Sequence, residues 1–406
     1  MFTTAFSHIL LQFLDESSFL WERYNFAVTA PHYDAEKLTE LKERLEAQLD
    51  GLLSSEENGW VAVLERISDN PMPGDIFTSS WLAIESTDSN RLDTVLQTIT
   101  KPNHALELAS ALTWFSFDRA RPFCERLLSS SSPLLQLAGL STYAASRKNP
   151  NNYLGEALQN PDPLLRCCAL KMIGELNLRD KLQIAKKHFS DEDPVCAFRA
   201  AWSASLLEDK SAIKTLLQFV DRKFSFADEA VMMAVRKAGS QNGPAIIHEL
   251  TKMPDKLRWA VMGAGALGDV TNIPWLLDMM KQTGHSRVAG EAFSTITGFD
   301  IVNSHMDTDA PEDFEETPSD DPDDERVDLD ADHFLPWPDV NKIRTWWEEH
   351  CSEFVPGSRY LCGKPINTEA LYWMIRNGYQ RQRYAASIEL MALNPGIALP
   401  ILETLN

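Results

Sequence analysis

The stretch Pro163-Leu-Leu-Arg-Cys-Cys-Ala-Leu-Lys-Met-Ile-Gly174 carries the pattern that decides the fold, because its small and apolar residues recur along the chain. Within it, Ala169, Leu170 and Ile173 share one face at helical spacing. A column of small residues in register with Ala169 advances in steps of 30, with one step of 31: Ser79, Ala109, Gly139, Ala169, Ala200, Ala230, Ala260 and Gly290. A column of eight with one slip indicates an internal repeat.

Each repeat is predicted to contain two short helices. Prolines stand six residues before the column in four repeats, where proline suits the first turn of a helix: Pro133, Pro163, Pro194 and Pro254. A second apolar run follows, and turn-forming stretches such as Asn149-Pro-Asn-Asn152 separate the runs. Small residues let neighbouring helices approach, and no single helical pair buries its apolar face alone. The sequence therefore predicts an all-α fold, a superhelical solenoid of short HEAT-like helical pairs.

The two ends of the chain depart from this period. Residues 1–56 are predicted to form an N-terminal helical cap with helices at 4–28 and 34–53, and residues 57–306 the repeat array. Residues 307–332 contain few large apolar side chains and many acids, which predicts a disordered insertion. Residues 333–406 form a Trp-rich segment followed by a C-terminal helical cap. Its helices are predicted at 368–377, 380–393 and 397–405.

The charge of the chain is strongly negative and unevenly placed. Of the formal net charge of −21, residues 307–332 carry −13, with fourteen acids against one arginine. Nucleic-acid binders need clustered Lys and Arg to displace counterions, so this class of partner is not expected. The chain shows neither a basic leader nor an apolar run of the ~18 residues that a membrane helix requires, so we expect a cytoplasmic protein without a membrane partner.

The six cysteines form no Cys-x-x-Cys pair, and three of them lie inside apolar helical patterns, so we expect buried free thiols. They are Cys124, Cys167, Cys168, Cys196, Cys351 and Cys362.

Four short motifs resemble functional sites, but their context favours structural roles. Gly263-Ala-Gly-Ala-Leu-Gly268 matches a dinucleotide-binding pattern, yet it lies late in a predicted helix, where close packing and a helix end explain it. Asp328-Leu-Asp-Ala-Asp332 begins like a calcium loop but lacks the required glycine. His32 and Asp34 lie in a predicted turn, as do Ser129–Ser132. We therefore predict no catalytic residue, no metal ligand and no cofactor.

Both ends of the chain carry further motifs. The N-terminal motif comprises Ala30-Pro-His-Tyr33, Leu38, Leu41, Glu43-Arg-Leu-Glu-Ala47 and Leu49-Asp-Gly-Leu52. The C-terminal motif comprises Leu335-Pro-Trp-Pro-Asp339, Trp346-Trp347, Phe354, Pro356-Gly357, Arg359-Tyr-Leu361, Gly363, Pro365, Gly378, Gln380-Arg381, Arg383, Ala385-Ala386 and Glu389-Leu390. Together they resemble a bacterial HEAT-repeat family of about 400 residues that is often encoded with type VI secretion genes. The chain departs from that family at Gln48, where a histidine is expected, and this argues against a metal site there.

Partner-binding candidates lie in the acidic and Trp-rich segments. The acidic candidates are Asp320, Asp321, Asp323, Asp324 and Glu325. The aromatic candidates Trp337, Trp346 and Trp347 either pack against the last repeats or form an exposed centre of binding energy. Arg381 and Arg383 either pair with the acidic segment or contact a partner.

Two classes of function remain open. The first is a protein-binding scaffold, a secretion-associated adaptor, chaperone or immunity protein that holds a cargo effector or toxin. The acidic segment would speed its encounter with a basic partner. The alternative is an enzyme on HEAT-like repeats, of the lyase or base-excision type, with its active site in a groove. Such an enzyme needs a positioned Cys or His, or a basic groove, and neither is evident in the sequence.

Overall fold

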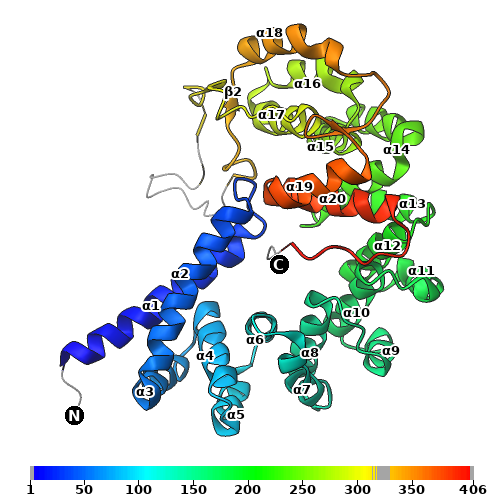
Figure 1. Cartoon of the computed structure of the whole chain (residues 1–406). Helices are drawn as coiled ribbons and strands as arrows, with labels where there is room; N and C mark the ends of the chain where they lie inside the picture. The colour runs from blue at the N-terminus through cyan, green and yellow to red at the C-terminus, as the bar shows by residue number, and fades with distance from the viewer. Residues whose placement is uncertain (1–3, 313, 316, 318–329, 403–406) are drawn as a thin grey trace. The chain divides into compact units, whose positions relative to one another are not determined.

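The computed structural model describes residues 4–312, 314–315, 317 and 330–402 (Figure 1). Within these residues, twenty α-helices make up most of the chain and four strands of two residues each complete the regular structure. Residues 75–300, all of them described, contain no strand. The all-α prediction is therefore confirmed.

The elements follow the chain in short pieces. The first ten helices are α1 (Thr4–Ala27), α2 (Ala35–Ser54), α3 (Glu56–Ile67), α4 (Pro73–Glu85), α5 (Ser89–Thr98), α6 (Pro102–Thr113), α7 (Phe117–Leu128), α8 (Pro133–Ala145), α9 (Asn152–Leu158) and α10 (Pro163–Glu175). The next seven are α11 (Leu182–Lys187), α12 (Pro194–Leu206), α13 (Ala212–Leu217), α14 (Ala227–Thr251), α15 (Leu257–Leu267), α16 (Ile273–Met279) and α17 (Thr283–Thr297). The last three are α18 (Val340–His350), α19 (Thr368–Asn377) and α20 (Gln380–Leu393).

The strands form two small antiparallel ladders. Strand β1 (Asp307–Thr308) pairs with β2 (Trp337–Pro338), and β3 (Tyr360–Leu361) pairs with β4 (Lys364–Pro365). Short 3-10 helices occupy Arg179–Lys181, His188–Ser190, Pro254–Lys256, Val270–Asn272 and Cys351–Glu353.

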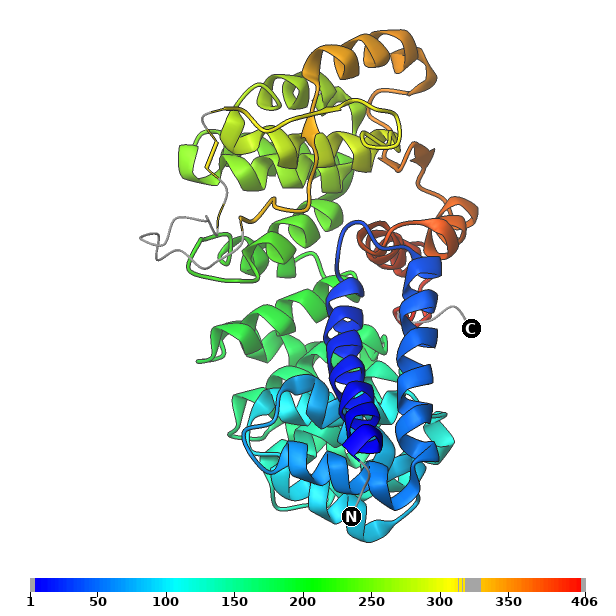
Figure 2. The ribbon, with the colours of Figure 1, turned by 90° about the vertical axis from the view of Figure 1, so that its left-hand side faces the viewer.

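Contacts within the chain define two compact units. The first comprises Met1–Ala185, Asp191–Ser203 and Gly396–Asn406, and the second comprises Lys186–Ser190 and Ala204–Pro395. The predicted repeat region 57–306 contributes to both units. In the first unit, the long helices α1 and α2 lie side by side (Figure 2). They correspond closely to the helices predicted at 4–28 and 34–53.

Beyond α3 the helices come in pairs, a first helix followed by a second. The pairs α4–α5, α6–α7, α8–α9 and α10–α11 follow one another in Figure 1. First helices pack against first helices, α4 on α6, α6 on α8 and α8 on α10. Helix α14 contains a complete pair, because its backbone breaks at Gly239, where φ is +63°.

Every member of the predicted small-residue column lies on a first helix and is buried. Its helices are α4, α6, α8, α10 and α12, followed by α14, α15 and α17. Ala169, Ala200, Ala230 and Ala260 are fully buried. Six first helices are followed, eight residues beyond the column position, by a residue with left-handed backbone: Thr87, Arg147, Asn177, Glu208, Gly268 and Gly298. The repeat thus sets the packing of the first helices and, in six of the eight, the turn that follows.

Gly268 shows why one of these turns needs glycine. Its φ is +78°, and a Cβ at this position would lie 2.2 Å from the carbonyl oxygen of Tyr360. The dinucleotide-like motif around it is therefore the end of α15, as its helical context predicts.

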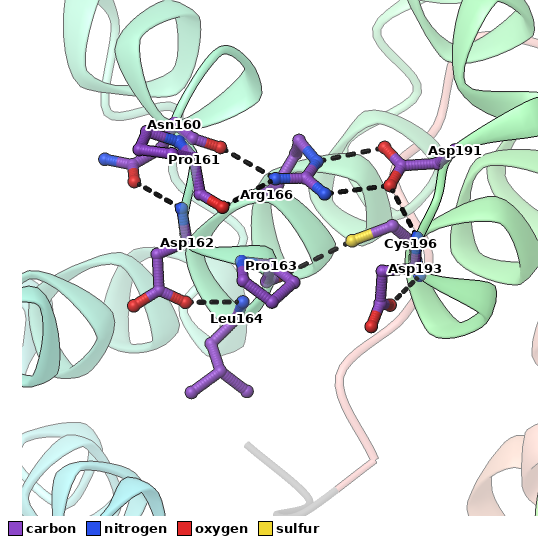
Figure 3. Close-up of polar contacts among 9 residues, drawn as sticks. All are labelled: Asn160, Pro161, Asp162, Pro163, Leu164, Arg166, Asp191, Asp193 and Cys196. Carbon is purple, nitrogen blue, oxygen red and sulfur yellow. Dashed lines mark hydrogen bonds and ion pairs between the residues drawn. The ribbon is translucent and has the colours of Figure 1, made fainter.

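Neighbouring repeats are also tied together by polar side chains at the start of their first helices (Figure 3). The Arg166 guanidinium on α10 donates hydrogen bonds of 2.9 and 2.8 Å to both carboxylate oxygens of Asp191, before α12. It also donates to the carbonyl oxygen of Asn160 at 2.8 Å. Asp162 and Asp193 each accept a hydrogen bond from a backbone N–H in the first turn of the following helix, both at 2.9 Å. The junction between α10 and α12 is thus rigidly defined.

The C-terminal tail corrects one prediction. The helix expected at 397–405 is absent from its described residues 397–402, which run without regular structure. Instead the Leu399 N–H donates to the carbonyl oxygen of Glu175 at 2.8 Å, and its own carbonyl accepts from Arg147 Nε at 2.8 Å. Asn177 Nδ2 donates to the carbonyl oxygen of Ile397 at 2.9 Å. The backbone of the tail is therefore hydrogen-bonded to residues at the C-terminal ends of α8 and α10.

Replacing Ala200 by Phe should destabilise the protein by roughly 1–3 kcal/mol, because the fully buried site has no room for a ring. The melting midpoint of the full chain measures the effect. Val195→Phe is the control, since Val195 lies on the same helix and is 38% exposed. Equal melting midpoints for the two variants would show that the small-residue column is not a site of close packing.

Candidate protein-binding surface

Trp337 belongs to a half-buried cluster of aromatic and charged side chains. Its ring lies 4.9 Å from that of Phe314, centroid to centroid. The Arg287 guanidinium lies 4.6 Å from the Trp337 ring centroid and 4.9 Å from that of Phe314. Arg287 also pairs with Asp330 at 2.9 Å. Two described residues of the acidic segment, Phe314 and Asp330, are thus held by one arginine.

A second arginine holds the end of the acidic segment. Arg258 donates two hydrogen bonds of 2.8 Å to Asp332, which is only 6% exposed. At the other end, β1 pairs with β2. Asp332 is thus buried at one end of residues 307–332, whereas β1 at the other end is exposed. The candidates Asp320, Asp321, Asp323, Asp324 and Glu325 lie outside the described residues.

Trp346 and Trp347 are half-buried and pack within the second unit. Both rings make edge contacts with Phe293 on α17, at centroid distances of 5.9 and 6.3 Å. Trp346 also stacks on His350, and Trp347 lies 5.5 Å from Phe354. Of the two interpretations of these rings, packing is the one that these contacts favour. These ring contacts join α17 to α18. In the sequence, the acidic segment lies between the two helices.

Arg381 and Arg383 have partners outside the acidic segment. Arg381 pairs with Glu291 at 2.5 Å, and burial raises the pKa of that carboxyl. Arg383 is 1% exposed and donates to the carbonyl oxygen of Ile375 at 2.7 Å and to Gln380. The described acids Asp332 and Asp330 are paired with Arg258 and Arg287.

The most exposed aromatic pair among the described residues of the second unit was not predicted from the sequence. Tyr372 and Trp373 on α19 are 46% and 50% exposed. The Lys364 ammonium lies 4.8 Å from the Trp373 ring centroid, and exposed Arg376 follows one turn along the helix. Leu371 and Met374, which flank this pair in the sequence, are fully buried. We name Tyr372, Trp373, Lys364 and Arg376 the α19 face. An exposed Trp–Tyr pair beside cations is a composition enriched at binding centres.

Two further motifs have structural explanations. Asp34 caps α2 by accepting a hydrogen bond of 2.9 Å from the Lys37 N–H, which explains the turn around His32. Ser129 borders an open pocket of about 480 Å³ in the first unit. Its hydroxyl donates to the carbonyl oxygen of Glu125 at 2.8 Å and lies 3.0 Å from the Tyr153 hydroxyl. These hydroxyl contacts belong to a polar turn, as predicted.

Comparison with known proteins does not assign the chain to a family. No protein-family model, curated protein or solved structure matches the chain. Among the described residues, no three His, Cys, Asp or Glu side chains are grouped to hold a metal ion. In the same part of the chain, every helix is too short or too polar to cross a membrane.

Proposed function

We propose that this chain is a protein-binding scaffold, a HEAT-like solenoid that holds its partner in a stoichiometric complex. The observation that carries the proposal is the repeated helical pair, with its buried column and its left-handed turn eight residues later. Stacked pairs of this kind leave long outer surfaces suited to another protein. The buried column explains why the pairs stack, since each needs its neighbour to cover its apolar face.

The α19 face is the proposed contact surface. Its two rings offer large apolar area with little side-chain entropy to lose, and Lys364 and Arg376 add charge at the rim. The acidic segment would raise the rate of encounter with a basic partner.

The biological setting rests on the resemblance of the two ends. It points to a cytoplasmic, type VI secretion-associated protein, either an adaptor or chaperone for a cargo effector or an immunity protein against a toxin. Both roles need tight binding and no turnover, so we do not propose an enzyme.

Binding should be stoichiometric when the protein is titrated with the purified product of a neighbouring secretion gene. Replacing both Tyr372 and Trp373 by Ala should weaken that complex by about 30-fold or more, as expected for a binding centre. Calorimetric titration gives both the ratio and the affinity.

Phe19→Ala is the matched control, because Phe19 is 57% exposed but lies in the first unit. An equal loss in both variants would remove the α19 face from the proposal. Catalytic turnover of the partner, abolished by one polar substitution, would defeat the scaffold function itself.

A further inference from the structure

The C-terminal tail belongs to the first unit, where residues of two neighbouring repeats hold its main chain. Arg147 Nε, just after α8, donates to the carbonyl oxygen of Leu399 at 2.8 Å. Asn177 Nδ2, just after α10, donates to the carbonyl oxygen of Ile397 at 2.9 Å. Between these contacts, the Leu399 N–H donates to the carbonyl oxygen of Glu175 at 2.8 Å. The ends of the two helices therefore recognise peptide groups, which any non-helical segment can present.

The two side-chain donors occupy equivalent places in their repeats. Arg147 and Asn177 each lie eight residues beyond the small-residue column, and both have left-handed backbone, with φ of +52° and +53°. The carbonyl groups that they bind belong to Ile397 and Leu399, which are two residues apart. Each repeat thus binds one carbonyl group of the tail, and the next repeat binds the alternate one.

Arg147 is oriented by groups other than the tail. Its Nη1 atom donates to the carbonyl oxygen of Ala144 at 2.6 Å and lies 3.4 Å from the carboxylate of Glu175, a side chain that is 6% exposed. Lys171 Nζ lies 3.5 Å from the other oxygen of that carboxylate. A donor that is already oriented loses little freedom when it binds a carbonyl group. The site is therefore preorganised for a peptide backbone.

Asn177 is only partly satisfied by the tail. Its Nδ2 atom binds Ile397, but its Oδ1 atom is buried and has no hydrogen-bond donor among the described residues. A buried acceptor without a donor costs free energy, because the hydrogen bond that it made to water is lost. A segment that places a backbone N–H at this oxygen would use both halves of the amide. The tail is therefore an incomplete ligand for this site.

One side chain of the tail is selected as well. Leu399 is 3% exposed, whereas Ile401, two residues later, is 43% exposed. The site thus combines hydrogen bonds to the main chain, which are independent of sequence, with burial of one apolar side chain. A segment of another protein with leucine at the equivalent position has the same two features.

We propose that the C-terminal ends of α8 and α10 form a binding site for a non-helical, leucine-containing segment of a partner protein, and that the tail covers this site in the free chain. The partner segment replaces the tail and supplies the N–H that Asn177 Oδ1 lacks. The inference rests on the proposed scaffold function but concerns a different surface. Peptide binding here and partner binding at the α19 face can therefore fail separately.

The test uses the full chain with Leu399→Asp, which puts a charge at the buried position and so releases the tail. The probe is a fluorescein-labelled synthetic peptide with the sequence of residues 394–402. We expect one peptide to bind per Leu399→Asp chain, at least about 10-fold more tightly than to wild type, because the tethered tail of wild type competes for the site. Ile401→Asp is the matched control. It adds the same charge at an exposed position and should bind the peptide as weakly as wild type.

Two further changes test the main-chain contacts. In the Leu399→Asp chain, Arg147→Ala should weaken peptide binding by about 10-fold, because it removes a charged hydrogen-bond donor. Lys148→Ala, at the exposed next position, should not. A peptide N-methylated at Leu399 should also bind more weakly, since it lacks the N–H that donates to Glu175. N-methylation at Ile401 should leave binding unchanged.

Equal peptide affinity of wild type and Leu399→Asp, or no binding to either, would overturn the proposal. Circular dichroism checks that the variant keeps its helices. Leu399→Ala, which removes the anchor without adding a charge, replaces it if the Asp variant does not fold. A wild-type dimer that Leu399→Asp dissociates would show that a second copy supplies the tail, and this outcome would also exclude the proposal.

Discussion

Replacing Asp332 by Asn is expected to lower the free energy of unfolding by about 2–4 kcal/mol, because it leaves the Arg258 guanidinium facing a neutral group. The Asp332 side chain is 7% exposed and that of Arg258 27%, so water replaces the lost carboxylate poorly. The two 2.8 Å hydrogen bonds also require two acceptor oxygens, and asparagine has one. Denaturant unfolding of the full chain measures the change.

Asp309→Asn is the matched control, since Asp309 is an exposed acid of the same segment. It makes the same change of charge without removing an arginine partner. Equal stability of the two variants would show that the Arg258–Asp332 pair does not anchor the segment. Because Asp330 and Asp332 are both paired, a deletion designed to test only the acidic charge should be confined to residues 318–329.

Local pattern predicted much of the fold. The helices predicted at 368–377 and 380–393 coincide with α19 and α20, and all eight column residues are buried. These features depend on neighbours in the sequence and on a repeat that fixes which face turns inward. The predicted helix at 397–405 is wrong because Leu399 hydrogen-bonds to residues more than two hundred positions away, and periodicity carries no such information.

The candidate site was harder to predict for the same reason. Trp346 and Trp347 stood out by composition, but their exposure depends on Phe293, which lies far away in the sequence. Asp332 and Arg258 are 74 residues apart, so their pairing could not be inferred from spacing. Trp373 was overlooked, although its position on the helix differs from the inward face of Leu371 and Met374. The helical spacing of the apolar residues along α19 was the signal that could have identified Trp373 as exposed.

Glu107 should make the stability of the first unit depend on pH. It lies on α6, is 7% exposed and accepts a hydrogen bond of 2.6 Å from Trp21 Nε1 on α1. Burial raises the pKa of this carboxyl from 4.5 to about 7, although the hydrogen bond from Trp21 lowers it in part. The Trp21 ring in turn stacks on that of Phe77, with 3.7 Å between the ring centroids, so the hydrogen-bond donor of Glu107 is itself held by packing.

The direction of the effect follows from the two protonation states. Below the unfolded pKa, both states hold the proton and stability is unaffected. As pH rises from 4.5 to about 7, the unfolded chain releases the proton while the folded chain retains it, so folding loses stability. Above that range the loss is complete. A difference of this size in pKa corresponds to about 3 kcal/mol of stability.

Glu107→Gln should remove this pH dependence, because the amide keeps a carbonyl oxygen for the Trp21 N–H but cannot ionise. Denaturant unfolding at about pH 5 and about pH 8 should show a smaller loss of stability in the variant than in wild type. The comparison is needed because the net charge of −21 makes general repulsion grow with pH in both proteins. Glu40→Gln, at an exposed position of α2, should lose as much stability as wild type between the two pH values. If Glu107→Gln loses as much as Glu40→Gln, the buried carboxyl is not the group that makes the first unit sensitive to pH.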